Sequence, residues 1–268
     1  MKTMKKYDHV FILGVDGAGT FFDKSDTPFT DSYMADGAKT SEMLTEIPTI
    51  SAQCWGSLLL GVECERHGLD NTYISENEYP IDAQTPSVFR VVREAMPEAE
   101  LASFSCWGPI NFGIIEHNLG VTFGTGDDDS IAEQIAEYLS LKAPTLLFAQ
   151  FDSVDGAGHS HGYGTPEHLN RITYVDALLG KVYGAIERAG IKDDSLVMVV
   201  ADHGGTPRGS HGGESDAEKY VSFFCNGDKI PECRLGKMKI RDIPSIVTYA
   251  LGIEPSAEWD SEIPAALK

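Results

Sequence analysis

The sequence is short of positive charge. Its 268 residues include 21 lysines and arginines against 41 aspartates and glutamates, which gives a formal net charge of −20. A surface of that sign repels the phosphates of nucleic acids and the headgroups of anionic membranes. We therefore expect neither polymeric nucleic acid nor a membrane as a partner. A small phosphorylated substrate would need a local positive charge.

Long apolar runs and paired cysteines are also missing. No apolar run approaches the roughly 20 residues of a membrane-spanning helix, and the basic N-terminus has no signal-peptide core before Asp8. The five cysteines are an odd number without Cys-x-x-Cys spacing. A disulfide framework or a cysteine zinc site is therefore not expected, and the composition favours a reducing, cytoplasmic location.

Short β-rich runs alternate with helical patterns along the chain. Near-continuous apolar runs predict strands at 9–16, 145–152, 195–202 and 220–227, with a weaker strand at 100–107. Apolar spacing predicts helices at 87–96, 129–142, 244–251 and from Pro166, after the N-cap Thr165, to Gly190. This alternation predicts one α/β domain over 1–268 with a mainly parallel sheet, in which 62–127 forms loops or a small cap.

Acidic side chains close three of the predicted strands. Asp16, Asp152 and Asp202 each follow an apolar run. A lone aspartate at such a place is usually a turn former or a helix cap. In open α/β sheets, however, ligands bind at the carboxyl ends of the strands, so three acids at one edge indicate a functional site.

Histidines gather beside these acids. Asp155 and His159 lie four residues apart in a glycine-rich stretch, Asp202 and His203 are adjacent, and His211 follows soon after. Carboxylate oxygen and imidazole nitrogen are ligands that zinc and manganese accept, and the glycines allow close approach. These residues therefore predict a metal site. Other histidines are interpreted as surface or packing residues: His9, His117 and His168.

A hydroxyl nucleophile is available in the segment 48–61. Thr49, Ser51 and Ser57 precede or begin an apolar helical pattern. Serine and threonine are also common helix caps. The two interpretations are compatible, because the positive end of a helix dipole stabilises both an alkoxide and a phosphate.

The order of these residues resembles the alkaline phosphatase superfamily, and within it the type I phosphodiesterase/nucleotide pyrophosphatase family. The similarity runs from Asp16 to about Gly213, and its most specific parts are the segments DGAGH and ADHGG in this order. The resemblance implies a three-layer αβα sandwich that holds two divalent metal ions, usually zinc, with manganese also compatible with the ligand types.

The resemblance also assigns roles by position. It gives the first metal to Asp155, His159 and His211, and the second to Asp16, Asp202 and His203 with a contact from the nucleophile. Counting ten residues back from Gly61 makes Ser51 the nucleophile. Thr49 is the secondary candidate, because threonine is commoner there in the diesterase branch.

The substrate contacts implied by the resemblance depart from the family pattern at one position. Family members have an asparagine three residues after the nucleophile that binds a phosphate oxygen. This chain has Cys54 there, so Gln53 or a backbone N–H would supply that hydrogen bond, and Gln53, Cys54 and Trp55 are the candidate substrate-binding residues. Trp55 is a candidate for stacking on the substrate, although an aromatic residue near a helix start is more often core.

The implied function is hydrolysis of a small phosphate ester by a phosphodiesterase or nucleotide pyrophosphatase, through a phosphoryl-serine intermediate. Two alternatives stay open. One is a phosphomonoesterase or phosphonate hydrolase on the same metal core, and the other is a metal-binding scaffold without catalysis.

Overall fold

The computed structural model describes residues 6–268. The first five residues lie outside the described range, and they belong to the basic N-terminal segment for which no signal-peptide core was predicted. Within this range one nine-stranded sheet has the order β4-β3-β5-β1-β6-β7-β2-β8, and β9 also pairs with β2. The strands are β1 His9–Val15, β2 Ala38–Leu44, β3 Leu101–Ser105, β4 Thr122–Gly124, β5 Leu146–Phe151, β6 Ser195–Ala201, β7 Tyr220–Asn226, β8 Cys233–Arg234 and β9 Met238–Lys239.

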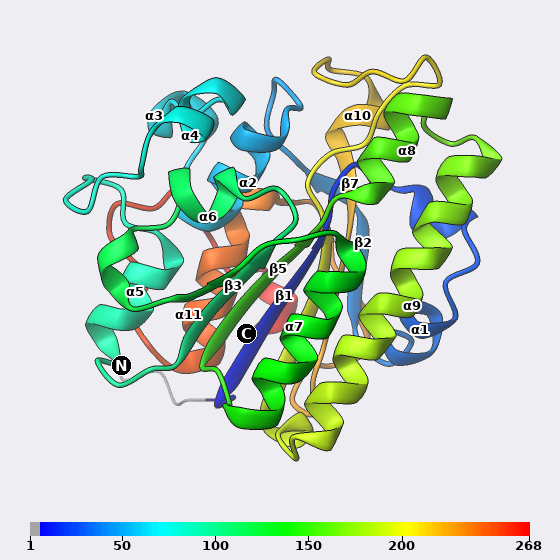
Figure 1. Ribbon diagram of the computed structural model, residues 1–268. Helices are drawn as coiled ribbons and strands as arrows, with labels where there is room; N and C mark the ends of the chain where they lie inside the picture. The colour runs from blue at the N-terminus through cyan, green and yellow to red at the C-terminus, as the bar shows by residue number, and fades with distance from the viewer. Residues whose placement is uncertain (1–5) are drawn as a thin grey trace.

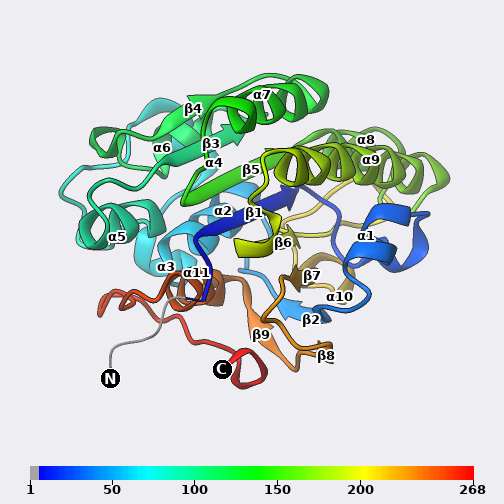
Figure 2. The same ribbon diagram turned by 90° about the horizontal axis from the view of Figure 1, so that it is seen from below.

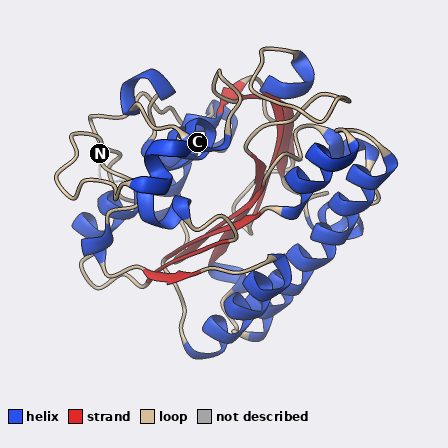
Figure 3. Ribbon diagram, turned by 45° about the horizontal axis from the view of Figure 1, so that its top comes forward, coloured by secondary structure: helices blue, strands red, loops and turns tan. Residues whose placement is uncertain are grey.

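Helices cover both faces of this sheet (Figures 1 and 2). The helices α1, α7, α8 and α9 form one layer, and α2, α5 and α11 lie on the opposite side, as the two blue groups in Figure 3 show. The α-helices are α1 Pro28–Tyr33, α2 Ser51–Leu60, α3 Cys64–His67, α4 Asn71–Glu76, α5 Val88–Ala95, α6 Pro109–Gly113, α7 Asp128–Leu141, α8 Ser153–His161, α9 Pro166–Arg188, α10 Asp216–Lys219 and α11 Ile243–Leu251. Short 3₁₀ helices are η1 Phe21–Lys24, η2 His117–Leu119, η3 Lys192–Asp194, η4 Ile240–Asp242 and η5 Ala265–Leu267.

The sheet is mainly parallel, so the predicted fold class is confirmed. Strands β4, β3, β5, β1 and β6 run parallel to one another, and β7 runs antiparallel to both β6 and β2. The central strands are buried along almost their whole length. This explains why they appear in the sequence as continuous apolar runs.

Helix α9 shows how local sequence signals set an element. The side chain of Thr165 accepts a hydrogen bond from the backbone N–H of His168, and Pro166 occupies the first turn. The helix ends at Arg188, and Gly190 follows with a φ of +71°. Glycine adopts this left-handed conformation without steric cost. The apolar stripe of α9 is buried: Ile172, Val175, Leu179, Val182 and Ile186.

The segment 62–127 and strand β2 differ most from the expectation. Its helix α5 and strand β3 correspond to the predicted helix at 87–96 and the predicted strand at 100–107. The segment also holds α3, α4 and α6 and supplies β4, a strand that was not predicted and that pairs with β3 at the side of the main sheet. Strand β2 has the sequence AKTSEML and a bulge between Thr40 and Met43. Its apolar residues do not alternate regularly, so the sequence pattern gave no strand signal there.

Two predicted absences can be compared with the structure. The part of the chain that the structure describes has no helix long and apolar enough to cross a membrane. All five cysteines are free: Cys54, Cys64, Cys106, Cys225 and Cys233.

Candidate metal and phosphoryl-transfer site

The register of three central strands brings the predicted acids to one edge of the sheet. Val15 at the end of β1 is paired with Phe151 at the end of β5 and with Ala201 at the end of β6. The next residues, Asp16, Asp152 and Asp202, therefore leave the sheet at the same level. The polar residues that follow these strands meet there, as expected for carboxyl ends of parallel strands.

Asp16, Asp202 and His203 form a fully buried cluster. His203 Nε2 lies 3.5 Å from Asp16 Oδ1 and 3.4 Å from Asp202 Oδ2. Neither of these two carboxylate oxygens has a hydrogen-bond partner among the described residues. Buried carboxylate oxygens without partners are costly. Their convergence on one imidazole nitrogen leaves three ligand atoms facing one another.

The spacing of these atoms fits a small divalent cation. Bonds of about 2.0–2.1 Å from a tetrahedral zinc place neighbouring ligand atoms about 3.3 Å apart. The separations of 3.4 and 3.5 Å in the cluster agree with that value. The donor types, carboxylate and imidazole, suit zinc and manganese alike.

The second oxygen of each carboxylate is held by neutral donors. Asp16 Oδ2 accepts hydrogen bonds from the indole Nε1 of Trp55 and the amide Nε2 of Gln150, each at 2.9 Å. Asp202 Oδ1 accepts hydrogen bonds from the backbone N–H of Gly17 at 3.0 Å and from the backbone N–H of His203 at 2.8 Å. These bonds fix the orientation of both side chains and leave one oxygen free for a cation.

The second predicted cluster is more exposed. His159 Nε2 lies 3.1 Å from Asp155 Oδ2 and 3.2 Å from His211 Nε2, and His211 Nε2 is 4.0 Å from Asp155 Oδ1. The imidazole of His211 stacks on that of His203 at a centroid distance of 4.0 Å. The two clusters are therefore adjacent, and His203 of the first cluster faces His211 of the second.

The three clustered histidines share one hydrogen-bond arrangement. In His159, His203 and His211, Nδ1 lies 2.9, 3.0 and 2.7 Å from a backbone carbonyl oxygen, and Nε2 faces the carboxylates. Because a carbonyl can only accept, Nδ1 carries the proton and Nε2 presents a lone pair, as in metal-binding histidines. The acceptors are Gly209, Gly204 and Thr49, respectively.

His168 is different, because the backbone occupies both of its ring nitrogens. Its Nδ1 accepts from the N–H of Gly164, and its Nε2 lies 3.2 Å from the carbonyl oxygen of Gly17. The residue is fully buried. It is thus a packing residue, as predicted.

The electrostatics of the site favour a bound cation. Burial is the largest cause that raises the pKa of Asp16 well above its usual value, followed by the negative charges of Asp202 and Asp155. Burial and the charge of Asp155 likewise raise the pKa of Asp202. Among residues 6–268, no lysine or arginine forms an ion pair with any of these three carboxylates. Their charge has no compensation from a basic side chain.

The structure separates the three hydroxyl candidates. Ser51 is the first residue of α2, and its Oγ lies 3.2 Å from His203 Nε2. Thr49 Oγ1 instead donates to the carbonyl of Gly213 and accepts the N–H of Gly212. Ser57 Oγ is 3.1 Å from the Nε2 of His67, on another part of the helix. Of the three, the Ser51 hydroxyl is the one placed against the metal cluster.

Two of the predicted substrate contacts are placed elsewhere. Trp55 and Cys54 are fully buried in the core, so their side chains are out of reach of a substrate. The reason is the helix period: the apolar side chains after Ser51 turn toward the sheet, and Trp55 packs edge-on against Phe148. Gln53 is partly exposed, and its Oε1 has no partner among the described residues.

The sequence analysis did not identify two residues that orient the site. Gln150 is a polar residue inside the apolar run LLFAQF, and that contrast is a usable signal. Tyr163 is fully buried and donates a hydrogen bond of 2.5 Å to Asp155 Oδ1. A Cβ on Gly158 or Gly205 would come within 2.4 Å of the Tyr163 ring, so glycine is required where the ring passes. No local pattern indicates this contact.

Comparison with known proteins supports the resemblance. Residues 102–212 match the family model described as type I phosphodiesterase/nucleotide pyrophosphatase. The chain is 34% identical over 110 residues to the catalytic subunit of human GPI ethanolamine phosphate transferase 3, which covers 38% of this chain and 9% of the relative. It is 23% identical over 242 residues to human ectonucleotide pyrophosphatase/phosphodiesterase family member 7, with 80% of this chain and 52% of the relative covered.

The fold is shared with solved structures. Murine ectonucleotide pyrophosphatase/phosphodiesterase 5 superimposes with a TM-score of 0.77 at 15% identity, over 95% of this chain and 97% of that chain. An inactive variant of the same murine protein has been solved in complex with AMP. The present chain spans about half or less of the length of the two curated relatives above. The family-model match over residues 102–212 confirms the resemblance of this part of the chain to the type I phosphodiesterase/nucleotide pyrophosphatase family, and the solved structures confirm the expected fold.

Proposed function

We propose that this chain hydrolyses phosphoric esters, with a preference for a small phosphodiester or nucleotide pyrophosphate, at a site for two divalent cations. The observation that carries the proposal is the pair of orphaned carboxylate oxygens, Asp16 Oδ1 and Asp202 Oδ2, that face His203 Nε2 beside the hydroxyl of Ser51. A purely structural role gives no reason to bury two unpaired carboxylates next to a serine hydroxyl.

Ser51 is the proposed nucleophile. Its position in the first turn of α2 places the hydroxyl in the positive end of the helix dipole, which stabilises an alkoxide and the phosphate that approaches it. When bound, divalent cations supply the positive charge that lowers the pKa of this hydroxyl and offsets the charge of the phosphate. Residues Asp16, Asp202 and His203 would hold one cation, and Asp155, His159 and His211 the other.

The chain's own groups then account for a two-step transfer. The Ser51 hydroxyl gives up its proton to solvent, Oγ forms a bond to phosphorus as the bond to the leaving alcohol oxygen breaks, and the leaving oxygen takes up a proton from solvent. Water then cleaves the phosphoryl-serine ester and restores the hydroxyl. Gln53, in the first turn of α2, is the proposed donor to a phosphate oxygen.

The preference for a diester rests on the family-model match and on the pyrophosphatase/phosphodiesterase relatives. AMP in the inactive murine neighbour is consistent with a nucleotide substrate class. A phosphomonoesterase or phosphonate hydrolase is the second candidate, because Cys54 replaces the asparagine expected near the nucleophile and is fully buried. That substitution changes the phosphate contacts without changing the cation ligands.

The test compares turnover of bis(p-nitrophenyl) phosphate with that of p-nitrophenyl phosphate, each with and without a chelator. The proposal expects the diester to be turned over faster and both activities to be lost on chelation and restored by zinc or manganese. Faster turnover of the monoester would support the second candidate. Metal binding without turnover of either compound would contradict a hydrolase and favour a scaffold.

A further inference from the structure

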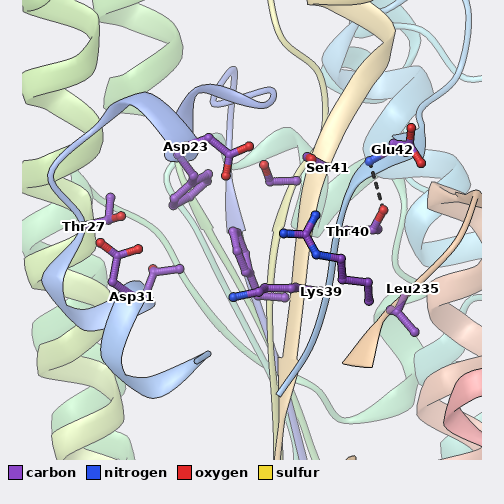
Figure 4. A pocket seen from close by; sticks show the side chains of 13 residues that line it. Asp23, Thr27, Asp31, Lys39, Thr40, Ser41, Glu42 and Leu235 are labelled. Carbon is purple, nitrogen blue, oxygen red and sulfur yellow. Dashed lines mark hydrogen bonds between the residues drawn. The ribbon is translucent and has the colours of Figure 1, made fainter. Parts of the chain in front are cut away.

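A polar cavity of about 450 Å³ lies away from the metal clusters, between the β1–β2 connection and the strands β2, β7 and β8 (Figure 4). One wall carries Asp23 from η1 and Asp31 from α1. The opposite wall carries Lys39 from β2 and Arg234 from β8. The volume is within the range of small-molecule sites.

The charged groups of the two walls do not pair with each other. Within the described range of 6–268, Asp23, Asp31, Lys39 and Arg234 take part in none of the ion pairs. Figure 4 shows Asp23, Asp31 and Lys39 around one space. A third carboxylate that lines the cavity, Glu42, points away from that space.

Two unpaired cations on one wall are notable in a chain with a net charge of −20. An anionic group is repelled by most of this surface, and a pair of basic side chains provides the local attraction it needs. The acidic wall attracts a positively charged group. A ligand with a single charge would pair with one wall and leave the charges of the other wall without a partner.

One of the residues that line the cavity has a polar group without a partner. Ser222 on β7 is fully buried, and its Oγ has no hydrogen-bond partner among the described residues. A buried hydroxyl without a partner is destabilising, and a polar group of a bound ligand would satisfy it. Phe22 and Phe224, which pack edge to face at 5.5 Å, supply apolar surface in the same cavity.

We propose that this cavity binds a small zwitterion of amino-acid size. The ammonium group lies against Asp23 and Asp31, the carboxylate lies against Lys39 and Arg234, and the carbon chain packs on the phenylalanine rings. None of these residues is a proposed metal ligand or nucleophile. The proposal therefore does not depend on the proposed hydrolase activity.

Isothermal titration of the metal-loaded full chain with ω-amino acids tests the proposal. The probes are 4-aminobutyrate, 5-aminopentanoate and 6-aminohexanoate, and pentanoate and pentylamine are the single-charge controls. At least one zwitterion should bind saturably with a Kd in the low millimolar range or below, and the single-charge compounds at least about tenfold more weakly. The proposal is overturned if no zwitterion saturates the protein below about 20 mM, or if pentanoate or pentylamine binds equally well.

Variants then locate the binding. Lys39→Gln and Asp31→Asn remove one charge from each wall at side chains outside the core, and each should weaken binding at least about tenfold. Lys181→Gln is the matched control, since Lys181 is an exposed lysine of α9 that pairs with Glu133. The Lys181→Gln variant should bind the zwitterion with wild-type affinity. Wild-type affinity in both Lys39→Gln and Asp31→Asn would place the zwitterion elsewhere and contradict the proposal.

Discussion

The indole Nε1 of Trp55 donates a 2.9 Å hydrogen bond to Asp16 Oδ2 from the same helix that begins with Ser51. Ser51 and Trp55 are four positions apart on α2. One rigid element therefore holds the proposed nucleophile and fixes the orientation of a proposed cation ligand. This relationship gives Trp55 a positioning role in place of the substrate contact expected from the sequence.

The first prediction concerns this bond. Trp55→Phe keeps most of the apolar volume and removes the N–H donor, so Asp16 loses one of its two anchors. We expect zinc affinity to fall about tenfold or more, measured by competition with a chromogenic chelator. Trp259→Phe is the matched control, because Trp259 Nε1 donates at 2.9 Å to the carbonyl of Pro86. Equal affinity in the two variants would show that Trp55 does not orient Asp16.

The second prediction concerns Tyr163 and the other cluster. Tyr163→Phe removes the hydroxyl that donates to Asp155 Oδ1 and keeps the ring against Gly158 and Gly205. We expect about a tenfold loss of affinity for one of two bound cations, resolved by calorimetric titration. Tyr79→Phe, which loses a buried hydroxyl bonded to the carbonyl of Thr85 at 2.8 Å, serves as the control. Two unchanged binding steps in Tyr163→Phe would refute this role.

Tyr163 and Gln150 mark the limit of what the sequence could predict about the site. Asp16, Asp202 and His203 were recognisable because they follow buried strands, and strand ends at one sheet edge must meet. Gln150 stands out as a polar residue in the apolar run of β5, but the sequence does not say which carboxylate it contacts. Tyr163 reaches Asp155 through packing that no local pattern indicates. Strand β2 was missed for a similar reason, since its polar residues and its bulge conceal the period of a strand.

The third prediction concerns the metal-free protein. The pKa values of Asp16 and Asp202 are raised in the fold, chiefly by burial, so the folded state binds more protons than the unfolded state above the ordinary aspartate pKa. In excess chelator, the free energy of unfolding contributed by these groups should therefore decrease as the pH rises through the raised pKa values.

Asp16→Asn isolates that contribution. In chelator near pH 8, urea unfolding should show the variant to be at least as stable as the wild type, because one buried negative charge is gone. With saturating zinc the order should reverse, because the variant loses a ligand. A variant less stable than the wild type in chelator would contradict the account of the site's charge.

The fourth prediction uses His67, which lies beside α2. Burial lowers the pKa of this imidazole from its ordinary 6.5 to about 4. The unfolded state then binds more protons between these values, so stability should be lost as the pH falls from about 6.5 to 4, by at most about 3 kcal/mol. His67→Gln should flatten this part of the profile of unfolding free energy against pH. An identical slope in the variant would assign the acid sensitivity to other groups.

The fifth prediction tests the central claim most directly: turnover of bis(p-nitrophenyl) phosphate by Ser51→Ala and Thr49→Ala, with bound metal quantified in the same samples by mass spectrometry. We expect Ser51→Ala to bind as much metal as the wild type and to lose at least about a thousandfold in kcat, because the group that attacks phosphorus is absent. Thr49→Ala should retain most of the activity, since its hydroxyl is bonded to the backbone of Gly212 and Gly213. Near-wild-type turnover by Ser51→Ala together with an inactive Thr49→Ala would contradict the account.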